Sequence, residues 1–411
     1  MSSRTSVQIR PSSAPRTRRR GPAADRQPAP APAPSSSSSS YVARCSEVAL
    51  LDAFTRRGIR DIVSVPCSIT DTWHALAAER ARAGELRLVM ASHEMNLAGI
   101  AGGVWFATGR PALVHMQNSG LPNAADGIVS FADPEVHGIP MAAMVTFRGA
   151  TPDDTSEPHQ AIGRRTEALV RAVFGPGSTI AGCRTGAGLL AAAEAVADAA
   201  VAGSIGVLQV AEAGLARTHR PSLPELADGR RLLPVAAIRA AKGAGSAPAA
   251  LRGADGVSRE DAIRAIAAAH PAAALLFSNG YTARAAQAFV DDARCFHNVG
   301  YMGGTLAIAW SLAKRAPWLE VVVVDGDQNA LMSAMKDQLV SDYPPNLHWY
   351  ILDNGIGASV GVSASMPLGP VYDDLARVVR TRPDEPGSFA LPRVSAPGGL
   401  PLSALARRFR G

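Results

Sequence analysis

Short apolar runs alternate with longer amphipathic segments along most of the chain from residue 41 onward. A nearly unbroken apolar run predicts a strand buried on both faces, because a half-exposed strand would alternate apolar and polar residues. Apolar residues spaced three and four apart predict helices. The predicted strands lie at 61–67, 86–92, 111–118, 139–149, 206–213, 273–279, 320–327 and 347–354. The predicted helices lie at 47–58, 71–84, 94–109, 189–203 and 258–269.

This order of elements predicts an α/β protein with two doubly wound, parallel sheets. The alternation is interrupted at residues 219–256, which are rich in Pro, Gly and Ala and therefore predict a linker. We expect one domain at 41–218 and a second at 257–411, with no middle domain between them. Residues 1–40 carry Arg, Pro and Ser tracts that cannot bury a core, so they predict a disordered tail.

The net charge of the chain is concentrated in that tail. Residues 1–40 contain seven Arg and one Asp, and the remaining residues contain 34 basic and 34 acidic side chains. The predicted domains therefore offer no electrostatic case for binding nucleic acid or a membrane surface. No run of about 18 apolar residues predicts a membrane span, and no apolar signal segment is present. With four scattered cysteines, these features predict a cytoplasmic protein.

Polar residues end two of the predicted strands. Asp325 and Asp327 follow the apolar run 321–324, and Asn354 ends the next predicted strand. Neighbouring parallel strands present their carboxyl ends at the same edge of a sheet, where ligands of such sheets bind. Asp327 and Asn354 can therefore share a cation such as Mg²⁺, which prefers oxygen ligands. For Asp327 taken alone, capping of the following helix is the more common role.

The sequence Gly-Asp-Gln at 326–328, followed by Asn354, resembles the GDG-x(n)-N motif of thiamine diphosphate (ThDP) enzymes. The resemblance implies that Asp327, Asn354 and the main-chain carbonyl of Ile356 bind Mg²⁺, which holds the diphosphate of the cofactor. A glutamine stands where the motif has its second glycine, the residue that permits close approach of the backbone. The residues implied to contact the cofactor's phosphates are Gly326, Gln328 and Asn329.

Two further segments resemble cofactor-binding parts of the same enzymes. The segment 91–109 resembles the N-E-x-x-A-x-x-A-A-G-Y block, which implies that Glu94 is catalytic and hydrogen-bonds the cofactor's aminopyrimidine ring. The alternative is that Glu94 complements the dipole of its helix. The segment 297–313 resembles the G-S-M-G region, which implies that Met302 supports the bent cofactor and that Gly300 and Gly303 let the backbone approach it. The alternative for Met302 is ordinary core packing.

The front half narrows the resemblance to one family. The segments SVPCS (64–68), HMQNSGLPNAADGIVSFADPEVHGIPM (115–141) and FRGATPDDTSEPHQ (147–160) resemble the phosphonopyruvate decarboxylase family, and sulfopyruvate decarboxylases share part of this pattern. The resemblance covers about residues 45–411. It implies a carbon–carbon lyase that uses ThDP and Mg²⁺ to convert phosphonopyruvate into phosphonoacetaldehyde and CO₂ during phosphonate antibiotic biosynthesis.

Candidate substrate ligands lie at the ends of two predicted front strands. Arg148 is a candidate for the phosphonate, because a guanidinium offers paired donors to such oxygens. An ordinary surface arginine is the alternative. Gln117, Asn118 and Ser119 end a neighbouring strand and could orient the substrate or the cofactor.

Glu94 and Asp327 lie in different predicted domains. In the family that the chain resembles, the cofactor bridges the front domain of one subunit and the rear domain of another. The resemblance therefore implies a homodimer or a higher homo-oligomer with active sites at the subunit interface. Two alternatives remain open at this point: decarboxylation of sulfopyruvate or another acidic 3-substituted pyruvate, and a non-catalytic scaffold that kept the fold.

Overall fold

The computed structural model describes residues 44–152, 154, 156–183, 186–219, 233–242, 248–251, 256–357, 364–383 and 394. The predicted tail at 1–40 and parts of the predicted linker, 220–232, 243–247 and 252–255, lie outside these residues. Helix α7 (Val235–Ala241) and the short turn η5 (Ala249–Leu251) form within the predicted linker. Among the helices of the described residues, none is both long and apolar enough to cross a membrane.

The described residues contain a parallel six-stranded sheet in the front half and a parallel five-stranded sheet in the rear half, which confirms the predicted fold class. The strand orders are β2-β1-β3-β4-β6-β5 and β11-β10-β9-β7-β8. The front strands are β1 (Asp61–Ser64), β2 (Arg87–Met90), β3 (Leu113–Gln117), β4 (Met141–Thr146), β5 (Thr179–Cys183) and β6 (Ile205–Val210). The rear strands are β7 (Ala274–Phe277), β8 (Cys295–His297), β9 (Val321–Gly326), β10 (Leu347–Asp353) and β11 (Arg377–Arg380).

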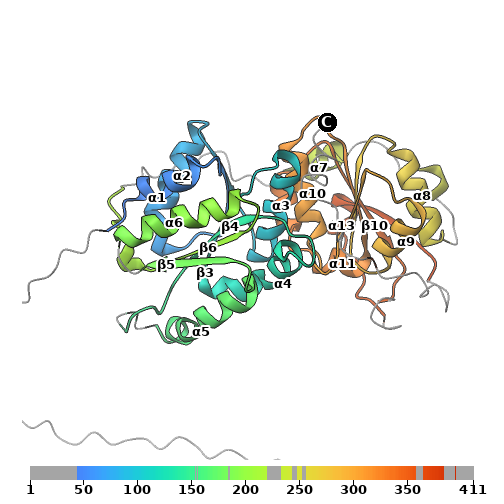
Figure 1. Cartoon of the computed structure of the whole chain (residues 1–411). Coiled ribbons are helices and arrows are strands. Elements are labelled where there is room, and N and C mark those ends of the chain that lie inside the picture. Colours follow the sequence, from blue (N-terminus) through green and yellow to red (C-terminus); the bar gives the residue numbers. More distant parts are fainter. Residues whose placement is uncertain are drawn as a thin grey trace, which may run out of the picture. The chain divides into compact units, whose positions relative to one another are not determined.

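Helices and short 3₁₀ turns connect the strands (Figure 1). The front helices are α1 (Glu47–Thr55), α2 (Asp71–Arg82), α3 (Leu97–Thr108), α4 (Leu121–Ala132), α5 (Glu157–Phe174) and α6 (Gly186–Val201). The rear helices are α8 (Arg259–Ala269), α9 (Tyr281–Phe289), α10 (Thr305–Arg315), α11 (Asp327–Met332), α12 (Lys336–Ser341) and α13 (Val371–Leu375). The 3₁₀ turns that matter for the site are η1 (Ser68–Thr70), η2 (Glu94–Asn96), η3 (Asn118–Gly120) and η4 (Glu212–Gly214).

Strand β4 shows why its sequence is apolar throughout. Met141, Ala143 and Val145 pack in the cluster formed with α3, α4 and α5, whereas Ala142 and Met144 pack in the cluster formed with α1, α2 and α6. Because successive side chains of a strand point to opposite faces, a sheet covered by helices on both sides needs apolar residues at every position.

Small residues in the 94–109 segment allow α3 to pack closely against α10. A Cβ atom at Gly103 would lie 2.4 Å from the carbonyl oxygen of Ile308. Nearby, the Ser311 hydroxyl donates a hydrogen bond to the carbonyl oxygen of Ile100 at 2.7 Å. The apolar cluster around these helices continues from the front sheet into the rear sheet, so the two sheets share one layer of packed helices.

Candidate active site

The rear part of the site lies where β9 and β10 end. In the parallel register of these strands, Ile351 lies opposite Asp325 and Leu352 lies opposite Gly326. Asp327 begins α11 directly after β9, and Asn354 follows directly after β10. The two residues therefore lie at adjacent carboxyl ends, as predicted from the sequence.

The Asp327 side chain is 5% exposed and fully engaged in this structure. Its Oδ2 atom accepts a hydrogen bond from the Ser365 hydroxyl at 2.7 Å, and its Oδ1 atom accepts one from the Gln328 N–H at 2.8 Å. Burial raises the pKa of the Asp327 carboxyl, and the charge of nearby Asp353 adds to this, while Arg259 lowers it. A second positive charge beside Asp327 would therefore stabilise the ionised carboxylate.

The loop after β10 folds back over Asp327. The Asn354 Oδ1 atom accepts a hydrogen bond from the Ile356 N–H at 3.1 Å, and Ile356 forms an antiparallel bridge with Ala364. The Ser365 N–H donates to the Gly355 carbonyl at 2.9 Å, which brings the Ser365 hydroxyl to Asp327.

The chemistry of Asp327, Asn354 and the Ile356 carbonyl suits a hard divalent cation. A carboxylate, a side-chain amide oxygen and a main-chain carbonyl are the oxygen donors that Mg²⁺ accepts. The cavity beside Asp327 has a volume of about 40 Å³ and is also lined by Ile356 and Gly357. That volume is about the share of one water molecule in the liquid. An ion bound to Asp327 Oδ2 would take the place of the Ser365 hydroxyl at that oxygen.

Asp325 has a different environment from Asp327. Its side chain is buried, and its Oδ2 atom accepts a hydrogen bond from the Trp349 indole N–H at 2.7 Å. Burial raises the pKa of Asp325 to about 7. Asp325 therefore belongs to the packing of β9 against β10, and Asp327 is the residue that faces the cavity.

The Gln328 side chain turns toward the loop after β10. A Cβ atom at Gly357 would lie 2.3 Å from Gln328 Nε2, so the absence of a side chain at residue 357 makes room for this carboxamide. The next residue, Asn329, accepts a hydrogen bond from the Gly303 N–H at 3.1 Å and donates one to the Asn279 carbonyl at 3.2 Å. Asn329 thus ties together the loops that surround the predicted phosphate site.

The Gly300–Gly303 segment has the backbone that its glycines predict. The φ angles of Gly300 and Gly303 are 85° and 70°, in the left-handed region that favours glycine. Tyr301 between them is fully buried, whereas Met302 is 45% exposed and its N–H donates to Asp126 Oδ2 at 2.9 Å. Met302 is therefore not packed in the core as the alternative requires, and its role in cofactor binding stays a prediction.

Glu94 begins η2, four residues after β2 ends, and its side chain is partly buried. The Asn123 side-chain amide donates a hydrogen bond to Glu94 Oε2 at 3.2 Å. A Cβ atom at Gly120 would lie 2.5 Å from Glu94 Oε1. The segment predicted to line the substrate cleft therefore also holds the Glu94 carboxylate, with one oxygen bonded and the other packed against a glycine.

A chain of polar contacts fixes the neighbouring edge of the front sheet. The Thr146 hydroxyl donates to Cys67 Sγ at 3.1 Å, and Cys67 Sγ donates to Gln117 Oε1 at 3.3 Å. Gln117 Nε2 in turn donates to the Ser119 hydroxyl at 2.6 Å. The predicted substrate residues Gln117 and Ser119 are thus oriented by the ends of β1, β3 and β4.

Asn118 and Arg148 are joined to each other. Asn118 is fully buried, and its side-chain amide donates to the Arg148 carbonyl at 2.9 Å and to the Thr166 hydroxyl at 2.7 Å. The polar atoms of Asn118 therefore face the protein and hold the backbone of Arg148 in place. A direct contact of Asn118 with substrate stays a prediction.

The Arg148 side chain is 18% exposed, so the alternative of an ordinary surface arginine does not describe it. Its guanidinium donates to the Ser68 hydroxyl and lies 3.9 Å from Glu212 Oε2. Its Nε atom is buried and has no hydrogen-bond partner among the residues that the structure describes. A buried donor of this kind calls for an explanation, and an acceptor supplied by a ligand is one.

Sequence reasoning missed several residues of this site. Arg259, at the start of α8, lines the same cavity as Asp327 and donates to the Thr282 hydroxyl at 3.1 Å. No pattern distinguishes it from other arginines in first helical turns. Ser365 was missed because its contact with Asp327 depends on the path of a loop. Gly120 and Asn123 lie inside the segment 115–141, but their contacts with Glu94 join residues far apart in sequence.

The chain is similar in sequence and in fold to proteins described as thiamine diphosphate enzymes or decarboxylases. The model of the thiamine pyrophosphate enzyme N-terminal TPP-binding domain matches residues 47–166, which include Glu94 and Arg148. The chain is 31% identical over 320 residues to phosphonopyruvate decarboxylase of Streptomyces hygroscopicus, covering 76% of this chain and 73% of that protein. It is 28% identical over 320 residues to phosphonopyruvate decarboxylase of Streptomyces viridochromogenes, covering 76% and 74%.

Among solved structures, an enzyme from Mycobacterium smegmatis described as thiamin diphosphate-dependent superposes with a TM-score of 0.57 at 12% identity, covering 82% of this chain and 99% of that one. This last similarity concerns the fold alone. The two parallel sheets and the matched front domain define a thiamine diphosphate-dependent enzyme. More narrowly, the chain belongs to the phosphonopyruvate decarboxylase family, whose members are carbon–carbon lyases.

Proposed function

We propose that this chain decarboxylates phosphonopyruvate to phosphonoacetaldehyde and CO₂ with Mg²⁺ and ThDP, as a step of phosphonate antibiotic biosynthesis. The observation that carries the proposal is the 31% identical relative of that name, which covers three quarters of the chain. Support comes from the site, because Glu94, Asp327 and Asn354 all lie beyond the carboxyl ends of strands.

In this proposal Asp327, Asn354 and the Ile356 carbonyl hold Mg²⁺ after the Ser365 hydroxyl has moved away from Asp327. When bound, ThDP supplies the electron sink that protein side chains lack for the electron pair left by loss of CO₂. Glu94 would hydrogen-bond the aminopyrimidine ring of a bound ThDP and exchange a proton with it. Asn123 holds the Oε2 atom of Glu94, which leaves Oε1 for that exchange.

Arg148 is the proposed ligand of the phosphonate. Its planar guanidinium, whose Nε lacks a partner among the described residues, carries paired donors that suit two oxygens of a tetrahedral acid group. Gln117 and Ser119 are proposed to hydrogen-bond the 2-oxo acid end. A sulfonate would meet the same guanidinium, so sulfopyruvate, with sulfoacetaldehyde as product, is the second candidate substrate.

We also propose that two copies of the chain share their active sites. Glu94 contacts residues of the front domain and Asp327 contacts residues of the rear domain. The proposed domain limits are 41–218 and 257–411, joined by 219–256, and the proposed location is the cytoplasm.

Mixing two inactive variants tests this shared site. A Glu94→Gln subunit combined with an Asp327→Asn subunit regains one intact site per dimer if the residues come from different chains. Recovery of about one quarter of the wild-type rate from an equal mixture supports the proposal, and no recovery after confirmed subunit exchange contradicts it.

The substrate is tested by CO₂ release from phosphonopyruvate, sulfopyruvate and pyruvate, each with ThDP and Mg²⁺. Phosphonopyruvate should give the highest kcat/KM. A higher kcat/KM for sulfopyruvate would identify sulfopyruvate as the substrate. If no 2-oxo acid is turned over, the chain is a non-catalytic protein that has kept the fold.

A further inference from the structure

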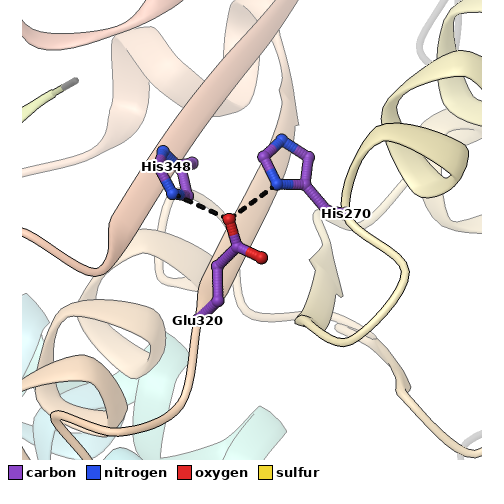
Figure 2. Close-up of side chains that lie close together, drawn as sticks. All are labelled: His270, Glu320 and His348. Carbon is purple, nitrogen blue, oxygen red and sulfur yellow. Dashed lines mark hydrogen bonds and ion pairs between the residues drawn. The ribbon is translucent and has the colours of Figure 1, made fainter. Parts of the chain in front are cut away.

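A second cluster of metal-ligating side chains lies in the rear domain, away from the proposed cofactor site. His270, Glu320 and His348 point toward one another, and their ligand atoms all lie within 4.8 Å (Figure 2). None of the three residues takes part in the proposed decarboxylation.

The three side chains converge on one oxygen atom. His270 Nδ1 lies 2.8 Å from Glu320 Oε1, and His348 Nε2 lies 3.0 Å from the same atom. The two imidazole side chains are 12% and 16% exposed, and that of Glu320 is 37% exposed. One side of the cluster is therefore open to solvent while the two rings are held inside.

Rigid elements present all three residues at the amino end of the rear sheet. Glu320 directly precedes β9, and its carbonyl accepts a hydrogen bond from the Ala274 N–H of β7 at 2.8 Å. His348 is the second residue of β10 and lies opposite Val322 in the sheet. His270 follows the last residue of α8. Asp327 and Asn354 lie at the other ends of β9 and β10, so this cluster is separate from the proposed magnesium site.

A second layer of contacts orients the rings. The His270 Nε2 atom lies 2.9 Å from the Tyr350 hydroxyl, which can accept or donate. The His348 Nδ1 atom lies 3.3 Å from a terminal nitrogen of Arg377, whose guanidinium also lies over the Tyr350 ring. A histidine that binds a metal through one nitrogen is commonly held by a hydrogen bond at the other, and the Tyr350 hydroxyl can hold His270 in this way. Arg377 only donates, so it cannot hold a metal-bound His348, whose Nδ1 atom would carry the proton.

We propose that His270, Glu320 and His348 bind one Zn²⁺ ion, with the fourth position open to solvent. Two imidazole nitrogens and one carboxylate oxygen form a ligand set that zinc accepts and that Mg²⁺ does not prefer. Such an ion connects the end of α8 to the starts of β9 and β10, so its role is structural rather than catalytic.

The present distances are close to those of a bound site. Ligand atoms about 2.1 Å from zinc in a tetrahedron stand roughly 3.4 Å apart, so each nitrogen needs to move from the carboxylate oxygen by about half an ångström.

Zinc binding changes the hydrogen bonding of both imidazoles. Each ring nitrogen that now faces Glu320 must present its lone pair to the ion, so the proton moves to the other ring nitrogen. His270 then donates to the Tyr350 oxygen. For His348, the marginal contact with Arg377 is given up, and Arg377 keeps its stacking on Tyr350 and its bond to the Lys242 carbonyl.

The test is a zinc titration of the full chain after treatment with a chelator, in excess Mg²⁺ and ThDP so that the cofactor site is filled. We expect one equivalent of zinc to bind and the melting temperature to rise with zinc concentration, since an ion that binds only the folded state stabilises it. Replacing zinc by Co²⁺ should give the visible absorption of a tetrahedral site with nitrogen ligands. CO₂ release should not change.

Matched variants identify the site. His270→Gln and His348→Gln should each lower zinc affinity at least tenfold, and Tyr350→Phe should lower it about tenfold through the outer contact. His219→Gln is the control, because His219 Nε2 lies 3.1 Å from Glu79 Oε2 in a simple histidine–glutamate pair. That variant should bind zinc as the wild type does.

Should the glutamine variants fail to fold, X-ray absorption at the zinc edge of the wild type distinguishes two imidazole ligands from an all-oxygen shell. Less than one tenth of an equivalent of bound zinc would overturn the proposal. So would an all-oxygen shell, or an affinity that the His270→Gln and His348→Gln variants retain. Any of these results leaves the three residues as a hydrogen-bonded cluster only.

Discussion

The contact between Gly120 and Glu94 makes a sharp prediction about catalysis. In Gly120→Ala, the added Cβ atom would lie 2.5, 2.6 and 2.7 Å from Oε1, Cγ and Cδ of Glu94, whereas ordinary contacts begin at 3.4 Å. The Glu94 carboxylate must therefore move by about 1 Å, a misplacement that can cost about 100-fold in rate when it affects a catalytic group. We expect kcat for phosphonopyruvate to fall by about that factor.

The same substitution should hardly affect folding. Gly120 has φ −84° and ψ −13°, which alanine adopts without strain. The group that must move is the end of a flexible, partly exposed side chain. We expect the free energy of unfolding, measured with urea, to change by less than about 1 kcal/mol. Gly177→Ala is the matched control, because a Cβ atom there meets no heavy atom of the described residues within 4 Å.

CO₂ release at saturating ThDP and Mg²⁺ provides the assay. If Gly120 acts through Glu94, the double variant Gly120→Ala/Glu94→Gln should have the same kcat as Glu94→Gln alone. The reason is that the effects of substitutions on kcat are not additive when the residues act together. A kcat of Gly120→Ala within twofold of the Gly177→Ala control would contradict a positioning role of Gly120. So would an effect of Gly120→Ala that is undiminished in the Glu94→Gln background.

Three further predictions follow from single side chains. Asn123→Ala removes the hydrogen bond to Glu94 Oε2 and should lower kcat about tenfold with little change in KM, as a steady-state assay will show; an unchanged kcat contradicts the positioning role. Arg148→Lys replaces a planar guanidinium by a point charge and should raise KM for phosphonopyruvate about tenfold or more; an unaltered KM would remove Arg148 from the substrate site. Burial lowers the pKa of His137 to about 4, and its Nε2 atom accepts a hydrogen bond from the Val299 N–H, so the neutral ring is stable in the fold. As the pH falls, His137 takes up a proton in the unfolded chain before it does so in the folded protein. The contribution of neutral His137 to the free energy of unfolding is therefore fully present above about pH 6.5. It decreases as the pH falls toward 4, by up to about 1.4 kcal/mol per pH unit. Urea unfolding between pH 7 and 5 should show a flatter profile for His137→Gln, and an identical slope would refute the assignment.

The apolar pattern predicted the strands that carry the site because those strands are central and buried on both faces. Strands β1, β3, β4, β7, β9 and β10 all fall within predicted runs, as does edge strand β2, and β6 begins one residue before its predicted run at 206–213. The pattern missed β5, β8 and β11, the remaining edge strands. Strand β8 has three residues, and β11 is Arg-Val-Val-Arg, so neither contains an apolar run long enough to stand out.

The placement of the candidate site was predictable only where the topology determines it. Asp327 and Asn354 come together because parallel neighbours share an edge, a rule that sequence order reveals. The contacts of Glu94 with Gly120 and of Asp327 with Ser365 depend instead on loop paths. The close approach of the Gln328 side chain to Gly357 also depends on the path of a loop, and no spacing in the sequence relates those two residues.

Comparison of the wild type with Glu94→Gln tests the proposed ThDP-dependent decarboxylation. Each purified protein is supplied with ThDP, Mg²⁺ and phosphonopyruvate, and both CO₂ release and ThDP affinity are measured. We expect decarboxylation by the wild type and a loss of kcat of about 10²–10⁴-fold in Glu94→Gln, the range of general acid–base catalysis, with the cofactor still bound. Full activity of the Glu94→Gln protein, or no CO₂ release by the wild type, would contradict this expectation.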